Sequence, residues 1–523
     1  MLLNWKLKPY ALSTDISKFF NRIKVHPSDR PYLNILWTES LDPNELPDAY
    51  TMLSHTFGYA STSAIAKASI DILHDKAIAS NLFELARALA FIYVDDINTS
   101  VWTFNELQEL KAQLTKILED HGFPLKGWAI SNSPPDASLS EHQYSTVGGW
   151  KWYSEQDIIQ LAVPPIFIGE KKKGSFQGDS KFLHANPTYN EILDFYKNTP
   201  ITLPHIISRT AMLFDMSGMA TPLSVMGSFV SRRALIDTKG NKKSQVSDQT
   251  KKIFMTYLYL VSKFGSLTFP RNLKRADQNQ KATLLTFADS SATAWIVVIY
   301  LLRLDHNKQF YTEFLYSTGG LNPIHRTIPR NELHSYSEAA DVIESLKDII
   351  EELIDDKYLI ADNKIAFFWI LNRAKKASLY VQNRVFKISS TFQDRQLLWV
   401  PTHSNPADVG TRPASMESQF THLEDGQFFR TGPKFLSQGI ESAIADNHLV
   451  PMQNIKSQVE QEIMDTILDI DPKESTAIDT NSFDMIHSKQ NSTDSIMIIN
   501  FSNPEFLKKL SKYKNLVITS YVT

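Results

Sequence analysis

The 523-residue chain contains no cysteine. This absence excludes disulfide bonds, thiolate zinc sites and cysteine nucleophiles, so any bound metal must rely on oxygen or imidazole ligands. No apolar run reaches the roughly 18 residues that span a bilayer; TAWIVVIYLL (293–302) is too short and predicts a buried strand instead. The first residues also lack the apolar core of a signal peptide. We therefore expect a soluble intracellular protein without a membrane partner.

The chain also lacks a large net charge, which is −3 at pH 7. The composition therefore carries no global signature of a nucleic-acid binder, although a basic channel can lie within a balanced total. Two lysine-rich stretches, 170–182 and 239–252, are expected to be exposed loops. They could be a solvated surface or a phosphate track, with Trp128, Trp150 and Trp152 close in sequence.

With 42% hydrophobic residues, the chain has enough apolar content for two to four globular domains. Up to residue 155, strand-like and helix-like stretches alternate, and the periodicity predicts helices over 62–80 and 105–122. Residues 201–280 are mostly helical in pattern. From 281 the pattern is three strands, a long amphipathic helix, and then further strands and helices.

The stretch FIYVDDINTS (91–100) places two adjacent carboxylates, Asp95 and Asp96, at the tip of an expected hairpin. Taken alone, the pair is typical of a solvated turn. A divalent cation offers another explanation, because magnesium is bound by carboxylate and phosphate oxygens. Asp15 is expected at the end of an adjacent strand, where it would complete a site for two ions about 3.5–4 Å apart that serve in-line phosphoryl displacement.

Four further acids occupy comparable positions in the second half of the chain. Asp289 and Asp362 are each expected to end a strand, Glu332 to open a long helix, and Asp408 to open a last helix. Strand ends and helix starts on one edge of a sheet converge on one crevice. Each acid alone would more often be a cap or a surface charge, but four acids that meet there require cations.

Several segments of the first half resemble reverse transcriptases. YVDD resembles the catalytic hairpin, and HGFPLKGWAISN and TVGGWKW resemble two later palm segments. FGYASTSAIAKASI resembles the segment that contacts template and nucleotide, although Ser63-Ala64 stands where a serine–proline pair is usual. Together with SRTAMLFDMSGMATPLSVMG and LTFPR, these segments resemble the Pol polyprotein of Pao/BEL-type long-terminal-repeat retrotransposons. The resemblance covers roughly residues 5–440.

This resemblance implies that Asp15, Asp95 and Asp96 hold two Mg²⁺ ions, or Mn²⁺, for nucleotidyl transfer. It further implies a set of nucleotide- or template-binding residues, namely Phe20, Phe57, Gly58, Ser63 and Lys126. Phe20 lies where the family places an aromatic gate against the ribose 2′-hydroxyl. Core packing is an equally good explanation of the same ring.

The second half resembles the type 1 ribonuclease H domain of the same retroelements, in TIPRNEL, YVQNRVFKI, LLWVPTHSNPADVGTR and FFRTGPKFL. The likeness implies that Asp289, Glu332, Asp362 and Asp408 coordinate two Mg²⁺ ions around the scissile phosphate of RNA. It also implies that His403 helps the product to leave. The alternative for His403 is packing against a neighbouring tryptophan.

The expected fold is an α+β reverse transcriptase palm with an antiparallel sheet, then a helical connection, then an α/β ribonuclease H-like domain. The expected boundaries are 1–160, 161–280, 281–420, a family-specific extension over 421–440, and an acidic linker over 441–523 toward a missing integrase. Fingers strands, a D-S/T-G protease motif and a gag zinc knuckle are not recognised in the sequence. Because fingers strands normally hold the triphosphate, we expect little or no primer extension by this chain alone.

The resulting hypothesis is a Pol fragment with RNA-directed DNA polymerase and ribonuclease H activities. Its expected partners are an RNA template, an RNA–DNA hybrid, a DNA primer and dNTPs, with other Pol or Gag products as further candidates. The expected location is the cytoplasm, within a virus-like particle, or the nucleus. One alternative is an inactive or domesticated relic that only binds nucleic acid. A DDE-type transposase is another, but it would not explain YVDD or the palm segments.

Overall fold

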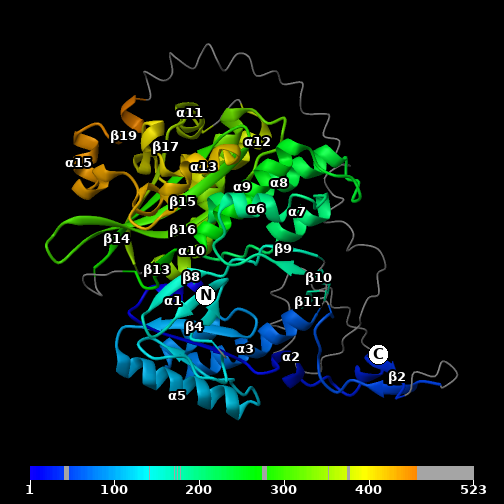
Figure 1. Ribbon diagram of the computed structural model, residues 1–523. Coiled ribbons are helices and arrows are strands. Elements are labelled where there is room, and N and C mark those ends of the chain that lie inside the picture. Colours follow the sequence, from blue (N-terminus) through cyan, green and yellow to red (C-terminus); the bar gives the residue numbers. More distant parts are fainter. Residues whose placement is uncertain are drawn as a thin grey trace.

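The structure is a computed structural model. It describes residues 1–455 apart from 40–45, 60, 141, 170, 173–174, 177, 179, 274–279, 352 and 374–376. In Figure 1 the palm-like part, coloured blue to cyan, lies below a larger part that runs from green to orange. Helix α1 (Leu2–Lys6) lies between the two parts. Among the described residues, no helix is both long and apolar enough to cross a bilayer.

A three-stranded antiparallel sheet of order β4-β1-β5 forms the centre of the palm-like part. Its strands are β1 (Tyr10–Asp15), β4 (Asp96–Val101) and β5 (Ala129–Ile130). The helices that belong to this part are α3 (Thr62–Ala79), α4 (Phe83–Ala90) and α5 (Phe104–Asp120). A shared cluster of buried apolar side chains from these elements fixes the sheet that presents the first acidic site.

Helix α5 shows how local sequence produces these elements. The Thr103 side chain accepts a hydrogen bond from the backbone of Glu106, whose side chain bonds back in a capping box. Four leucines at helical spacing, Leu107, Leu110, Leu114 and Leu118, are buried against the sheet. Gly122 follows the helix with φ of 81°, the left-handed conformation in which helices often end at glycine.

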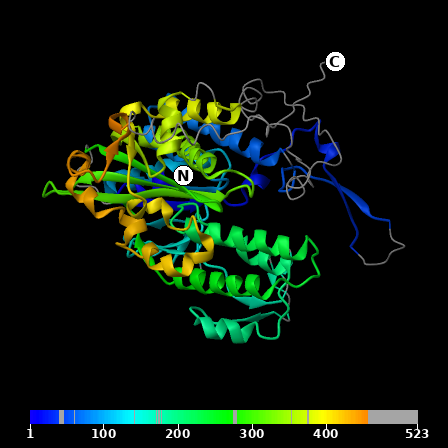
Figure 2. The ribbon, with the colours of Figure 1, turned by 90° about the horizontal axis from the view of Figure 1, so that it is seen from above.

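A two-stranded ribbon extends away from this part, to the right in Figure 2. It consists of β2 (Asn34–Trp37) and β3 (Asp48–Thr51), which pair antiparallel, and every residue in both strands is exposed. The short helices α2 (Phe19–Arg22) and η1 (Arg30–Tyr32) precede it in the chain. These strands were not predicted from the sequence.

A second sheet, of order β13-β8-β7-β6, joins the palm-like part to the rest. Its strands are β6 (Ser145–Val147), β7 (Trp150–Tyr153), β8 (Ile158–Leu161) and β13 (Thr268–Pro270). Directly after β13, the fully buried guanidinium of Arg271 forms an ion pair with Asp157, from the turn between β7 and β8. Arg271 also donates hydrogen bonds to three carbonyls of residues 5–9, so it ties α1 and the start of β1 to this sheet.

The intervening region contains two small strand pairs followed by four helices. The strands are β9 (Phe167–Ile168), β10 (Lys171–Lys172), β11 (Ser175–Phe176) and β12 (Lys181–Phe182). The helices are α6 (Tyr189–Phe195), α7 (Leu203–Thr210), α8 (Thr221–Thr238) and α9 (Asp248–Phe264). Much of the lysine-rich stretch 170–182 lies outside the described residues.

A six-stranded mixed sheet of order β16-β15-β14-β17-β18-β19 dominates the larger part. Its strands are β14 (Ala282–Ser290), β15 (Ala294–Leu304), β16 (Phe310–Leu321), β17 (Ile354–Ala361), β18 (Leu397–Trp399) and β19 (Val450–Pro451). Its long helices are α10 (Ile328–Ile350), α11 (Lys364–Leu371) and α12 (Leu379–Thr391). These three helices share one buried apolar cluster with the sheet.

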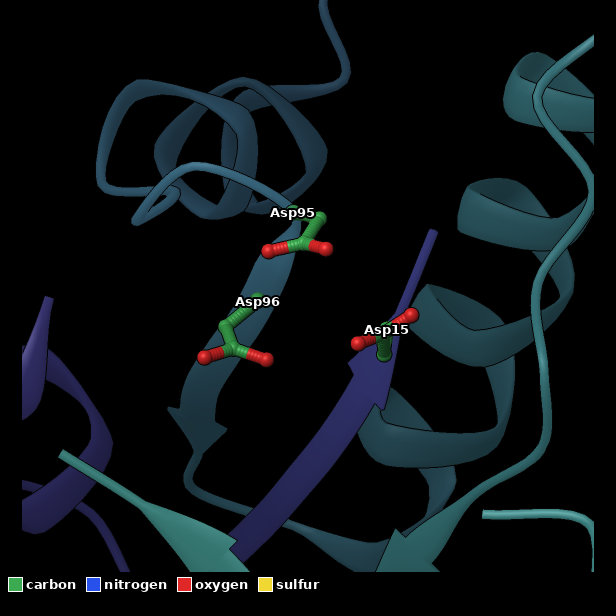
Figure 3. A group of neighbouring side chains, drawn as sticks. All are labelled: Asp15, Asp95 and Asp96. Carbon is green, nitrogen blue, oxygen red and sulfur yellow. The ribbon is translucent and has the colours of Figure 1, made fainter. Parts of the chain in front are cut away.

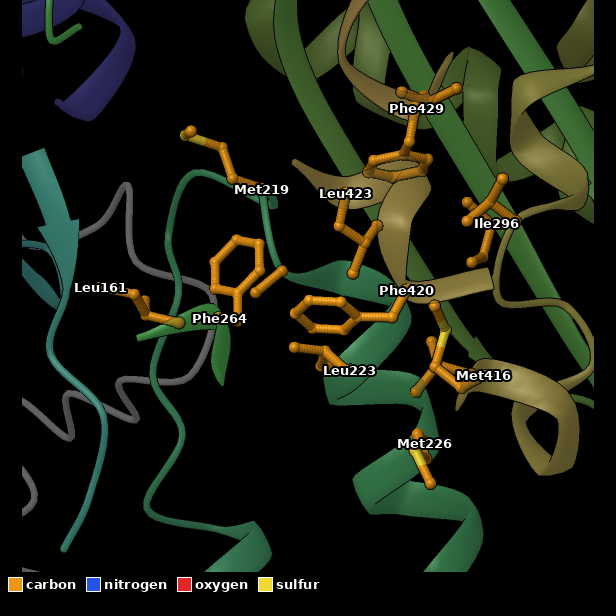
Figure 4. Packing of buried hydrophobic residues seen from close by; sticks show 14 of the residues in the cluster. Leu161, Met219, Leu223, Met226, Phe264, Ile296, Met416, Phe420, Leu423 and Phe429 are labelled. Carbon is orange, nitrogen blue, oxygen red and sulfur yellow. The ribbon is translucent and has the colours of Figure 1, made fainter. Parts of the chain in front are cut away.

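A different cluster includes side chains from the same sheet, from α8 and from the chain after residue 413. Figure 4 shows Phe420 beside Leu223 of α8 and close to Phe264 of α9. The elements of this late segment are α13 (Met416–Gln419), η6 (Phe420–Leu423), α14 (Phe428–Thr431), η7 (Lys434–Gln438) and α15 (Ile440–Ala445). The helices before residue 280 and the strands after it therefore share one continuous core.

The predicted fold class is confirmed, but two details of the prediction are wrong. The linker does not begin at 441, because α15 and β19 belong to the packed structure and Met452 is fully buried. The remaining linker, 456–523, lies outside the described residues. Trp150 and Trp152 are fully buried and Trp128 is nearly so. These three rings therefore cannot stack on nucleic-acid bases.

Candidate functional site

The first acidic site lies where β1 ends beside the start of β4. Asp15 is the last residue of β1, and it pairs in register with Asp96, the first residue of β4. Asp95 precedes Asp96 in the hairpin, and its carbonyl accepts a hydrogen bond from the backbone of Ile16. Figure 3 shows the three carboxyl groups side by side. Each of the three acids offers an oxygen within 4.8 Å of the others, so the predicted convergence is confirmed.

The hairpin turn that carries Asp95 is strained. Tyr93 and Asp96 exchange two backbone hydrogen bonds, of 3.0 and 2.9 Å, which leaves Val94 and Asp95 at the tip. Val94 has φ of 57°, in the left-handed region that a β-branched residue rarely adopts. Such a conformation costs roughly 1–3 kcal/mol. The pairing of β4 with β1 therefore holds the acids in place against a local preference of the backbone.

Lys126 lies directly at this site. Its Nζ is 2.8 Å from Oδ1 of Asp15, and its backbone donates to the Asp15 carbonyl at 3.0 Å. Burial, together with repulsion from Asp95 and Asp15, raises the pKa of Asp96 to about 7. Burial also raises the pKa of Asp15, although Lys126 opposes the change. The protein alone thus leaves negative charge at this site incompletely compensated.

The other predicted nucleotide-binding residues lie in three different segments of the chain. Phe20, in α2, is partly buried against the palm core and stacks on Phe19 with ring centroids 5.9 Å apart. Phe57 is 77% exposed, and the adjacent Gly58 has φ of 103°. Ser63 is exposed in the first turn of α3. No contact in the structure tests the binding role of these four residues.

The second acidic site lies at one edge of the six-stranded sheet. Asp289 is near the end of β14, Asp362 directly follows the neighbouring parallel strand β17, and Glu332 lies in the first turns of α10. Carboxylate oxygens of the three lie within 4.8 Å of one another. Asp289 is only 4% exposed and Glu332 5% exposed. The expected meeting of strand ends and a helix start is therefore confirmed for three of the four acids.

The electrostatics of this second site are unfavourable for the protein alone. Burial, and then the nearby charges of Asp362 and Asp408, hold the pKa of Asp289 well above its usual range. The pKa of Glu332 is likewise raised well above its usual range, first by burial and then by Asp289 and Asp362. Buried carboxylates with raised pKa values are typical of functional sites, because such an arrangement is costly without a compensating charge.

Asp408 differs from the prediction. It ends a short 3₁₀ helix, η4 (Pro406–Asp408), rather than opening an α-helix, because Gly410 and a second proline interrupt the chain soon afterwards. Its Oδ1 is 2.7 Å from Nη1 of Arg412. It lies outside the tight group of three, yet it is near enough to affect the pKa of Asp289. His403 is exposed in η3 (Thr402–Ser404).

Asp362 has supporting contacts that the sequence did not reveal. Its carbonyl accepts a hydrogen bond from Trp399 Nε1 at 2.8 Å. The buried Asn405 donates to the carbonyl of Ala288 at 3.1 Å and approaches Oδ1 of Asp362 at 3.5 Å. Asn405 thereby connects the strand that carries Asp289 to Asp362. In NPADVGTR the sequence predicts a role only for Asp408, three residues after Asn405.

A basic and aromatic cluster beside α10 was also missed. The Arg384 guanidinium lies 3.6 Å from the centroid of the Tyr380 ring, and that of Arg326 lies 5.2 Å from it. Arg326 Nη1 and Arg384 Nε are buried without a hydrogen-bond partner in the described part of the chain. Arg326 precedes the helix that carries Glu332, whereas the other two residues lie on α12. Their sequence separation hides the cluster from any local pattern.

Residues 202–363 match the family described as "Pao retrotransposon-like RNaseH-like domain". This match confirms the Pao/BEL-type resemblance for one continuous segment, which begins at α7 and ends just after Asp362. No curated protein matches the chain.

Solved structures of foamy viral protease-reverse transcriptase are similar to this chain at low identity. One in complex with double-stranded DNA has 14% identity and a TM-score of 0.43, and covers 76% of this chain and 57% of that one. Another, with an RNA/DNA hybrid, has 12% identity and a TM-score of 0.42, and covers 76% and 44%. The chain thus spans about half the length of these proteins.

Proposed function

We propose that this chain is the palm and ribonuclease H portion of a retroelement Pol protein, and that its second acidic site hydrolyses the RNA strand of an RNA–DNA hybrid. The observation that carries the proposal is the convergence of three carboxylates, two of them buried, at the edge of a sheet that matches a ribonuclease H-like family. A sheet edge of this kind is where α/β folds place their chemistry.

The residues present fit a divalent cation. Asp289, Glu332 and Asp362 offer only carboxylate oxygens, which Mg²⁺ and Mn²⁺ prefer, and the raised pKa values of Asp289 and Glu332 show charge that the protein leaves uncompensated. Bound cations would supply charge stabilisation at the attacking and leaving oxygens of phosphoryl transfer. The protein's own part is to hold the three oxygens together and to keep them largely shielded from water. Asp408 is a fourth ligand in this proposal, available once Arg412 releases it.

The first acidic site supports nucleotidyl transfer in the same proposal. Asp15, Asp95 and Asp96 present a similar oxygen set, and Lys126 partly neutralises it. A primer, a template and dNTPs are the proposed substrates, with Phe20, Phe57, Gly58 and Ser63 as proposed contacts. The foamy viral protease-reverse transcriptase structures are complexes with double-stranded DNA or an RNA/DNA hybrid. In this chain nucleic acid is a proposed partner.

The cluster of Arg326, Tyr380 and Arg384 supports a nucleic-acid substrate for the second site. Guanidinium groups pair well with phosphate oxygens. Both arginine side chains are partly exposed, and the cluster adjoins the helix of Glu332. We assign to it a backbone phosphate of the hybrid, which would place the RNA strand across the acids.

The test is cleavage of a labelled RNA strand in an RNA–DNA hybrid by the 523-residue chain in Mg²⁺. We expect cleavage by the wild type and none by Asp289→Asn or Asp362→Asn. Asp446→Asn changes an exposed aspartate of the same unit and is expected to cleave normally. Folded wild-type protein that binds the hybrid without cutting it would contradict the proposal and favour the relic.

A further inference from the structure

The turn between β14 and β15 receives side chains from two distant elements. Ser290, directly after Asp289, ends β14, and Ser291 opens the turn. The Ser291 carbonyl accepts one hydrogen bond from Asn322 Nδ2, at 2.8 Å, and another from Asn331 Nδ2, at 3.1 Å. Asn322 Nδ2 also donates to Ser290 Oγ at 2.8 Å. Two carboxamides therefore converge on the residues that follow an acid of the second site.

The same turn lies beside the acids. The backbone of Ser290 is near enough to the Glu332 carboxylate to oppose the burial that raises the pKa of Glu332. The Ser291 hydroxyl donates to the carbonyl of Thr411 at 2.8 Å, and the Thr411 hydroxyl donates to the carbonyl of Asp408 at 3.0 Å. A shift of this turn would therefore move the group beside Glu332 and the segment that carries Asp408.

Both asparagines are fully buried. Asn331 directly precedes Glu332 in α10, so its side-chain bond also fixes where that helix begins relative to the turn. Neither Asn322 Oδ1 nor Asn331 Oδ1 has a hydrogen-bond partner in the described part of the chain. An unpaired buried acceptor is costly. Both asparagines therefore leave their Oδ1 atom unpaired while their Nδ2 groups donate to the Ser291 carbonyl.

We call the bonds of Asn322 and Asn331 to the Ser291 carbonyl the brace, and a further bond connects it to the helical region. Asn322 follows β16, and its carbonyl accepts a hydrogen bond from Arg232 Nη1 of α8 at 2.7 Å. Its backbone N–H donates to the carbonyl of Thr293 at 2.8 Å, at the far end of the same turn. Arg232, on a helix outside the sheet, thus fixes the position of Asn322 through the Asn322 carbonyl.

We propose that Asn322 and Asn331 are positioning residues of the second acidic site, and that Arg232 anchors them to helix α8. This inference rests on the proposed function, because it concerns how the chain orients the acids for a cation. Groups that orient metal ligands typically change metal affinity or activity 10–100-fold when they are removed. It follows that the helices before residue 280 are part of the nuclease site and do not merely connect it to the palm.

The test is calorimetric titration with Mn²⁺ of the full chain, with Asp15, Asp95 and Asp96 replaced by Asn so that only the second site binds. We expect Asn331→Ala and Arg232→Met to weaken Mn²⁺ binding at least tenfold. Arg232→Lys should restore most of the affinity, because one N–H suffices for the Asn322 carbonyl.

Arg233→Met is the matched control, since Arg233 is adjacent on α8 but bonds to Thr250 and Gln249 of α9. It should bind Mn²⁺ like the parent. Parent affinity in both Asn331→Ala and Arg232→Met, with unchanged circular dichroism, would overturn the brace and leave the proposed function intact. A parent that binds Mn²⁺ no better than its Asp289→Asn derivative would overturn the proposed function itself. In hybrid cleavage, we expect kcat to fall in Arg232→Met while the KM for hybrid stays unchanged.

Discussion

Arg271 offers the sharpest test of how the palm-like part is attached. Its fully buried guanidinium donates to both carboxylate oxygens of Asp157, at 2.6 and 2.8 Å. It also donates to the carbonyls of Trp5, at 2.5 Å, Lys8, at 3.1 Å, and Pro9, at 2.6 Å. One side chain therefore satisfies the last turn of α1, the residues that lead into β1, and an acid from the β7–β8 turn.

The variant Arg271→Met keeps much of the side-chain length and removes all five bonds. Three carbonyl oxygens then lose this donor, and the partly buried Asp157 loses its cationic partner and keeps the bond from Trp152 Nε1. Breaking a buried pair by removing one partner costs about 3–5 kcal/mol. Because an unfolding entropy of about 2.1 cal/mol/K per residue makes 1 kcal/mol equal to about 1 °C in a unit of about 450 residues, we expect a fall of about 3–5 °C.

Scanning calorimetry of the whole chain at pH 7 measures this change. Arg373→Met is the control, because the Arg373–Asp394 pair is solvent-exposed and such pairs contribute about 0–1 kcal/mol. Arg271→Met that unfolds within about 2 °C of Arg373→Met would refute the reasoning that this buried pair holds α1 and β1 in place.

Three other outcomes are expected. Burial lowers the pKa of Lys6 to about 7, so between pH 7 and 10 the unfolded chain binds one more proton than the folded chain and stability rises with pH. Lys6→Met should therefore melt at a higher temperature than wild type at pH 6, by a margin that shrinks toward pH 10. A margin independent of pH would contradict the prediction. Lys126→Met removes a cation from the first site. Because the Lys126 ammonium repels a bound Mn²⁺ by about 1 kcal/mol, the variant should bind Mn²⁺ there about fivefold more tightly. Calorimetry with the second site disabled measures this affinity, and weaker binding would count against the prediction. Limited proteolysis should spare residues 441–455, since α15 and β19 are packed, and early cleavage at Met452 would contradict that packing.

The acids at strand ends could be predicted from the sequence because the signals that place them are local. A strand-like run that ends at Asp15 or Asp289 predicts a strand with a carboxylate at its end, and period 3.6 predicts the helix that carries Glu332. Convergence follows from the geometry of one sheet edge. Asp408 was placed less well, because the prolines and Gly410 around it produce 3₁₀ turns rather than a helix.

The contacts that were missed join residues far apart in sequence. Arg232 and Asn322 are 90 positions apart, and no periodicity connects them. Trp152 is close in sequence to a candidate phosphate track, but it packs edge-on against Trp5 with ring centroids 5.1 Å apart. Strand β19 has only two residues, which is too short for any pattern to distinguish it from a linker.

Helix α1 has a consequence for how the chain is made. Leu3 belongs to the same buried cluster as Met452, about 450 residues later, and Trp5 to another that reaches Leu449. During synthesis at about 5–20 residues per second, helix α1 must wait roughly 20–90 s for the partners that complete its burial. Contacts of such long sequence separation also slow folding itself. Leu3 and Trp5 therefore stay exposed to chaperones until the segment around Met452 has been made.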